Sequence, residues 1–191
     1  MPAEAGGPSL KPTARRSLLF WGAATVVLVL DLWTKDAVFD HLGFDPASAT
    51  SAEPVGPVPR VKVAGDWLRF VALLNSGMMW GAFRDHPAVL KVVRPLAVLV
   101  IFVLLSGLPA EQRSARVALG GILGGALGNI YDSFRYLGVR DFLEVDLDIP
   151  VFDPFPAFNV ADSAICVGVA VLALGMMRSS KHERTEAPAA S

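Results

Sequence analysis

Three segments, GGILGGALGNIYD (residues 120–132), VRDF (139–142) and FNVADS (158–163), decide how this chain folds. The first is apolar and rich in glycine, the second lies in an acidic connection, and the third opens another apolar segment. Together they contribute three carboxylates, Asp132, Asp141 and Asp162. An ionisable group at the edge of a membrane span, or inside it, is costly and is therefore a candidate functional group. The question is whether these acids form one site.

The composition is that of a membrane protein. Of the 191 residues, 53% are hydrophobic and only 18% are charged. Several uncharged runs approach the length of about 20 residues that a helix needs to cross a bilayer. The net charge of −1 provides no global field, so we expect no nucleic-acid partner. The single cysteine, Cys166, excludes an internal disulfide, and we interpret it as a small packed hydrophobe.

Four apolar segments are expected to form transmembrane helices, over about 17–39, 87–108, 117–134 and 156–177. The third has glycines at four-residue spacing (Gly120, Gly124 and Gly128), which predicts a face for close helix contact. The membrane domain then occupies residues 17–177. Residues 1–16 are expected to form a disordered cytoplasmic arm, and residues 178–191 a cytoplasmic tail.

Between the first two apolar segments, residues 41–85 have a different pattern. The run VKVAGDWLRFVALL (61–74) predicts two short strands around a Gly65-Asp66 turn. Met78, Met79 and Trp80 follow in a stretch that favours an interfacial segment. The predicted fold is an all-α membrane protein of four transmembrane helices with a small extracytoplasmic β-sheet and a short interfacial helix.

Charge distribution predicts the orientation. Lys and Arg gather in the N-terminal arm, the 109–116 link and the C-terminal tail, whereas residues 132–155 hold six acids and two arginines. Positively charged loops stay in the cytoplasm, so both termini are expected there. Asp31, Asn75 and Asp141 would then lie at the opposite face.

Polar residues near the span ends recur at i, i+3 and i+4, which places each triplet on one helix face. The triplets are Asp31-Thr34-Lys35, Asn129-Asp132-Ser133 and Asn159-Asp162-Ser163. Lipid cannot satisfy such faces, so they should turn inward and form one polar cluster. Two carboxylates in contact cannot both ionise cheaply, and such a pair can activate a water molecule. By this reasoning Asp132 and Asp141 are equal candidates to pair with Asp162. The three histidines, His41, His86 and His182, lie in separate regions, so no metal site is expected.

Five motifs resemble those of the lipoprotein signal peptidases, a family of bacterial membrane aspartic proteases. They occur in the family's order, as DLWTK (31–35), NSGMMWG (75–81), GGALGNIYD (124–132), VRDF (139–142) and FNVADS (158–163). The resemblance implies that Asp141 and Asp162 are the catalytic pair. It implies supporting or substrate-positioning roles for eight further residues: Asn75, Gly77, Asn129, Asn159, Asp31, Lys35, Asp132 and Ala161.

The same resemblance implies the biological setting. The expected activity is removal of signal peptides from prolipoproteins before a diacylglyceryl-modified cysteine, without a metal or other cofactor. Expected partners are lipid-modified prolipoproteins and membrane lipids, and the protein is expected to be a monomer. It would be a multi-pass protein of the bacterial cytoplasmic (inner) membrane, with its active site near the extracytoplasmic face.

The chain departs from the family pattern at Ser133, where arginine is usual, and Arg135 follows two residues later. Met78 and Met79 stand where small residues are usual. An inactive or weak relative that binds lipoproteins is therefore an alternative, and a small carrier or proton channel is another.

Individual residues also have simpler interpretations. Asp162 could cap a helix, Asp141 could be a solvated loop acid, and Asp31 with Lys35 is interpreted as a structural ion pair.

Overall fold

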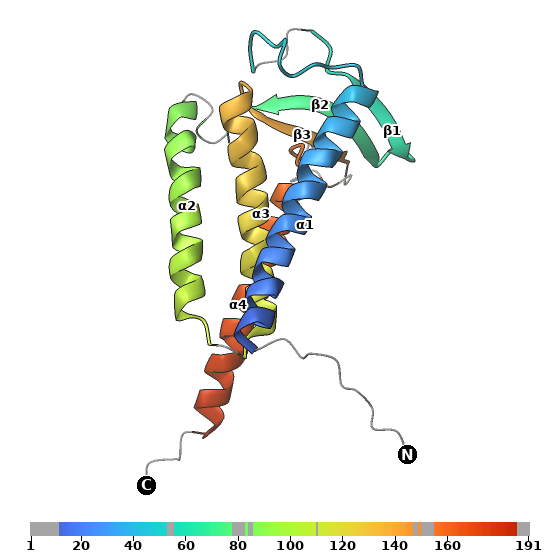
Figure 1. The fold of residues 1–191 in the computed structure, drawn as a ribbon. Helices are drawn as coiled ribbons and strands as arrows, with labels where there is room; N and C mark the ends of the chain where they lie inside the picture. The colour runs from blue at the N-terminus through green and yellow to red at the C-terminus, as the bar shows by residue number, and fades with distance from the viewer. Residues whose placement is uncertain are drawn as a thin grey trace, which may run out of the picture.

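The computed structural model describes residues 12–52, 56–77, 83, 86–109, 111–146, 149 and 155–186. Within these residues the chain forms four helices and three strands (Figure 1). The helices are α1 (Pro12–His41), α2 (Pro87–Gly107), α3 (Arg113–Arg135) and α4 (Val160–Glu186). The strands are β1 (Arg60–Ala64), β2 (Leu68–Asn75) and β3 (Val139–Val145).

The bundle is built around α3, which packs against each of the other three helices. In the described part of the chain, three helices are long and apolar enough to cross a membrane, over Ser17–His41, Ala88–Gly107 and Val160–Arg178. The third expected span forms α3, which is not among them, so three helices are apolar enough to cross a membrane where four were expected. Since α3 is the central helix, much of its surface meets protein, and it buries glycines and polar side chains there.

The glycines of α3 allow the close helix contact that their spacing predicted. A Cβ on Gly120 or Gly124 would collide with a backbone carbonyl of α1, and one on Gly128 would collide with the Asp31 carboxylate. On another side of α3, a Cβ on Gly125 would lie 2.6 Å from the Ala161 carbonyl oxygen of α4. The backbones of α1 and α4 therefore approach α3 without intervening side chains.

This geometry makes Gly125→Ala a destabilising change. We expect it to lower the free energy of unfolding by about 1–3 kcal/mol, as overpacking of a close contact does. Gly121→Ala is the matched control, because its Cβ would meet only Val27 Cγ2, at 4.0 Å. Thermal or denaturant unfolding in detergent compares the two variants. Equal stability of both would contradict the close α3–α4 contact.

The helix ends differ from the boundaries that we expected. α1 begins at Pro12 and α4 continues to Glu186, so helix extends into both the expected arm and the expected tail. Proline is favoured in the first turn of a helix, where its missing N–H is not needed, which explains the early start. The expected interfacial segment with Met78, Met79 and Trp80 lies outside the described residues.

A three-stranded antiparallel sheet of order β1-β2-β3 lies at one end of the bundle. The start of α1 and the end of α4 lie at the opposite end (Figure 1). The β1–β2 hairpin confirms the strand prediction, but β3 was expected to be a loop and is a strand paired with β2. Residues Val139 to Phe142 are all buried, so β3 lacks the alternation of a strand with one face in water.

Candidate active site

The acids and amides of the sequence motifs meet where the sheet joins the bundle. A cavity of about 320 Å³ opens there, and we call it the dyad cavity. Its wall includes residues from β2 and the turn after it, and from α2, α3, β3 and α4, among them Asn75, Gly77, Arg94, Asn129, Asp141 and Asp162. Asp141 and Asp162, which we call the dyad, therefore share this cavity. In the described part of the chain, no group of three or more His, Cys, Asp or Glu side chains is arranged to hold a metal ion.

Asp141 is held by the sheet. Its Cα pairs with that of Leu73 on β2, and the residue is only 2% exposed. The Asn75 amide Nδ2 donates a hydrogen bond to Asp141 Oδ2 at 2.9 Å. The Gly77 backbone N–H donates to Asn75 Oδ1 at 2.9 Å, which fixes the amide so that its Nδ2 points to Asp141. The simpler interpretation of Asp141 as a solvated loop acid is wrong.

Asn159 connects the two acids. Its segment is held next to β3, because Phe158 and Leu143 exchange backbone hydrogen bonds of 2.8 and 2.9 Å. From there, Asn159 Nδ2 donates to Asp141 Oδ1 at 2.7 Å. Asn159 Oδ1 accepts from the Asp162 backbone N–H at 2.9 Å. One fully buried amide thus fixes Asp141 and the start of α4 relative to each other.

Asp162 has two kinds of partner. Its Oδ2 accepts from the Asn159 backbone N–H at 3.3 Å, and this reciprocates the Asn159 cap as in a capping box. Its Oδ1 accepts from the Asn129 amide Nδ2 of α3 at 2.8 Å. The helix-capping interpretation is therefore correct for one oxygen, while the other belongs to a tertiary network at the cavity. Cys166, one turn later, is exposed and lines the cavity, so it is not the packed hydrophobe that we expected.

Lys35 lies behind the dyad in a fully buried ion cluster. Its ammonium group contacts Asp31 Oδ2 at 2.7 Å, Asp132 Oδ2 at 3.0 Å and Asn129 Oδ1 at 3.0 Å. Asp31 Oδ1 in turn accepts from the Ala161 backbone N–H at 2.9 Å, where a helix N-terminus favours an anion. Asp31 and Lys35 are therefore an ion pair, as predicted, and the pair also joins α1, α3 and α4.

Asp132 is separated from Asp141 and Asp162 by its partners. Besides Lys35, it accepts from Arg140, through the backbone N–H at 3.0 Å and Nε at 3.1 Å. It is not among the residues that line the dyad cavity. From the sequence, Asp132 and Asp141 were equal candidates to pair with Asp162. In the structure Asp132 is instead paired with two cations, Lys35 and Arg140.

Two arginines at this site were not among the functional residues predicted from the sequence. Arg140 is buried, is hydrogen-bonded to Asp36 and Asp132, and its guanidinium lies 4.7 Å from the Tyr136 ring centroid. Its neighbour in sequence is Asp141, so this anchor also holds the acid. Arg94, a charged residue within an apolar segment, lines the dyad cavity. Its position inside an apolar span was the feature of the sequence that could have identified it as a candidate functional residue.

The environment of Asp141 changes its acidity. Burial and the negative charge of Asp162 raise the pKa of Asp141 from its ordinary value of 3.8 to about 8. The hydrogen bonds from Asn75 and Asn159 act in the opposite direction but do not cancel the rise. At neutral pH the pair therefore retains a proton, which is the state required for one carboxyl to act as acid while the other acts as base.

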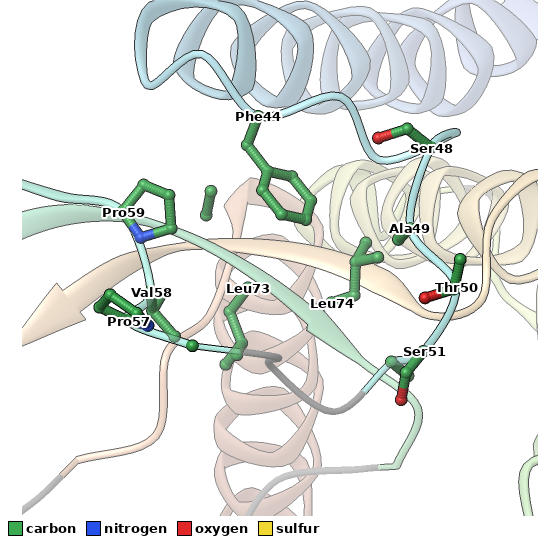
Figure 2. Close-up of a pocket in the computed structure, with 13 residues that line it drawn as sticks. Phe44, Ser48, Ala49, Thr50, Ser51, Pro57, Val58, Pro59, Leu73 and Leu74 are labelled. Carbon is green, nitrogen blue, oxygen red and sulfur yellow. The ribbon is translucent and has the colours of Figure 1, made fainter.

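A second pocket, of about 240 Å³, lies between the 44–59 loop and β2 (Figure 2). Phe44, Thr50, Pro59 and Leu74 are among its walls. The described residues that line it carry apolar or hydroxyl side chains, and none of them has a titratable group. It shares no described residue with the dyad cavity, so acid–base chemistry belongs to the latter.

Apolar helices, a small sheet and a cavity with two carboxyl groups between them define a multi-pass membrane protein with an enzyme-like site. The family model described as signal peptidase (SPase) II matches residues 23–178. The chain therefore belongs to the signal peptidase II family and is a peptidase. The prediction made from the five motifs is confirmed at the level of the family.

Individual relatives agree with this assignment. The lipoprotein signal peptidase of Halalkalibacterium halodurans is 29% identical over 88% of this chain and 98% of its own length. That of Streptomyces coelicolor is 34% identical over 84% and 71%. Among solved structures, one described as a bacterial membrane enzyme matches with a TM-score of 0.69 at 18% identity, covering 93% of this chain and 94% of that one. This structural likeness supports the fold.

Proposed function

We propose that this protein is an aspartic endopeptidase that removes signal peptides from prolipoproteins, cutting before a diacylglyceryl-modified cysteine. The observation that carries the proposal is the pair Asp141 and Asp162 in one cavity, connected by Asn159. Membership of the signal peptidase II family and the names of the relatives supply the substrate class.

In the proposed reaction the pair starts with one proton. The ionised carboxyl accepts a proton from a water molecule, and the water oxygen forms a bond to the scissile carbonyl carbon. The protonated carboxyl donates its hydrogen bond to the carbonyl oxygen, which stabilises the tetrahedral intermediate. The C–N bond then breaks as a proton passes from the pair to the leaving amine. The pair returns to its starting state with one proton.

The surrounding residues have two proposed roles. Asn75, Gly77, Asn129 and Asn159 orient the two carboxyl groups through the hydrogen bonds given above. Asp31, Lys35, Asp132 and Ala161 hold α1, α3 and α4 at the distances that these bonds need. None of these last four residues lines the cavity, so they act on the dyad only through the residues that do.

The proposed setting is the bacterial inner membrane. All four helices would cross it, and the neighbouring helices would shield α3 from lipid. The sheet and the dyad would lie on the extracytoplasmic side and both termini in the cytoplasm. The acyl chains of the substrate would stay in the bilayer while the scissile bond reaches the cavity. We propose a monomer, because both acids and the amides that orient them come from one chain.

The alternatives have less support. A carrier is expected to have internal repeats or broken helices at mid-membrane depth, and α2, α3 and α4 run unbroken. The argument for an inactive relative depends on Ser133, and Arg94 brings a guanidinium to that residue. The family assignment favours the peptidase over both.

The direct test uses the purified protein and a prolipoprotein carrying diacylglyceryl-cysteine. We expect one cleavage, immediately before the modified cysteine, identified by the mass of both products. The same prolipoprotein with an unmodified cysteine is the control and should be cut much more slowly. Absence of cleavage by the intact, folded protein would favour the inactive relative.

The pH dependence of this cleavage is a further readout. Because the raised pKa of Asp141 is about 8, the pair loses its last proton near that pH. We expect kcat/KM to fall on the alkaline side with an apparent pKa near that value. A rate that stays constant through this range would contradict the single-proton mechanism.

A further inference from the structure

Arg94 reaches the dyad cavity from α2. Its Nη1 donates a hydrogen bond to Ser133 Oγ of α3, and its Nη2 donates to the Gly77 carbonyl oxygen at 3.3 Å. The side chain is half-buried and forms part of the cavity wall with Asp141 and Asp162. A cation in an apolar helix is energetically costly, so an arginine that is held there by polar partners is a candidate functional residue.

The charge of Arg94 acts on three acids, Asp162, Asp141 and Asp132. Asp132 already has ion pairs with Lys35 and Arg140. Among the described residues, the two dyad acids accept only amide and backbone hydrogen bonds. Arg94 is therefore the cation that faces them from the cavity.

Two other cations, Lys35 and Lys91, already have partners of their own. From α1, Lys35 also acts electrostatically on both acids, but its ammonium group is hydrogen-bonded to Asp31 and Asn129 and paired with Asp132. On α2, Lys91 is exposed and lies 6.0 Å from the Phe134 ring centroid. Lys35 therefore acts on the two acids from behind the cavity wall and with the larger effect on Asp162, whereas Arg94 is the cation that lines the cavity itself.

Arg94 also supports the turn after β2. Its bond to the Gly77 carbonyl holds the residue whose N–H fixes the Asn75 side chain, and Asn75 donates to Asp141. A chain of three hydrogen bonds therefore runs from α2 to the carboxyl group of Asp141. Loss of Arg94 would therefore weaken this series of hydrogen bonds and also remove the positive charge from the cavity.

We propose that Arg94 is the positioning residue of the dyad, providing from α2 the positive charge that the family pattern places at residue 133 on α3. The inference rests on the proposed peptidase function. In this arrangement Ser133 is the acceptor that anchors the arginine, so its presence does not mark an inactive site. The arginine orients Asn75 and stabilises the single negative charge shared by the two acids.

The first test is Arg94→Ser in the purified, full-length protein. We expect kcat/KM to fall about 10- to 100-fold, in line with loss of hydrogen bonds to a charged group. The pH–rate profile should also move to higher pH by about one unit, because a lost cation makes the pair harder to ionise. Lys91→Ser, one turn earlier on the same helix, is the matched control and should leave both unchanged.

The second test moves the arginine. The exchange variant Arg94→Ser with Ser133→Arg should regain at least half of the lost activity on a logarithmic scale and return the profile toward that of the wild type. A loss of activity in Arg94→Ser with an unchanged profile and no recovery in the exchange variant would overturn the proposal, because a merely structural arginine behaves in that way.

A third measurement does not depend on cleavage. Infrared titration of the protonated carboxyl band, assigned by its absence in Asp141→Asn, follows the dyad in the resting protein. Arg94→Ser should move this titration to higher pH, and Lys91→Ser should not. A titration that is identical in the wild type and in Arg94→Ser would overturn the proposal even if the wild type failed to cleave a prolipoprotein.

Discussion

Asp141→Asn and Asp162→Asn are each expected to lower the rate of prolipoprotein cleavage by about 10²- to 10⁴-fold, the usual contribution of a positioned acid or base. Asparagine has nearly the shape of aspartate but cannot carry the proton between water and the leaving amine. The two acids act as one unit. The rate of the double variant should therefore lie within a few-fold of that of the slower single variant.

The matched control is Asp66→Asn. Asp66 lies in the turn of the same sheet, and its side chain is 82% exposed and paired with Lys62. The substitution makes the same chemical change outside the cavity, and cleavage should keep its wild-type rate. Cleavage that survives Asn at either 141 or 162 would exclude the proposed pair.

Unfolding experiments separate loss of chemistry from loss of structure. The pKa of Asp141 is about 8 in the folded protein against 3.8 ordinarily, so the folded state binds the extra proton between these values. The stabilisation is complete below the ordinary pKa and is lost as the pH rises through about 8. Asp141→Asn should remove this part of the pH dependence of the unfolding free energy and remain folded.

Lys35→Met is expected to have the largest effect on stability, a loss of about 3–5 kcal/mol in the free energy of unfolding. The change leaves Asp31 and Asp132 buried with one cation fewer, and both side chains are fully inaccessible. The penalty of an uncompensated buried charge explains the size. Thermal unfolding in detergent, with activity as a second readout, measures it.

Two further variants make this prediction specific. Adding Asp31→Asn to Lys35→Met removes the charge that the lysine left behind, so the double variant should be more stable than Lys35→Met alone. Lys62→Met removes an exposed partner of Asp66 and should be close to the wild type. If Lys35→Met were as stable as Lys62→Met, the buried cluster would not contribute to stability as described.

The helices and the first hairpin could be predicted because their signals are local. Apolar length predicted α1, α2 and α4, and the turn at Gly65 predicted the pairing of β1 with β2. β3 could not be predicted in this way, since Arg140 and Asp141 resemble loop residues until their partners are known. Arg140 is satisfied by Asp36 and Asp132, and Asp141 by Asn75 and Asn159.

The apolar helices, the glycine face of α3 and the polar triplets at the helix ends could all be derived from the sequence alone. These depend on spacings of three or four residues, which a regular helix converts directly into a shared face. Which acids meet, by contrast, depends on how the helices and strands pack. The bonds from Lys35 to Asn129 and from Ala161 to Asp31 join residues 94 and 130 positions apart. Such pairings follow from how α1, α3, β3 and α4 pack, because a buried carboxyl group is defined by the donors around it, and those donors come from other elements.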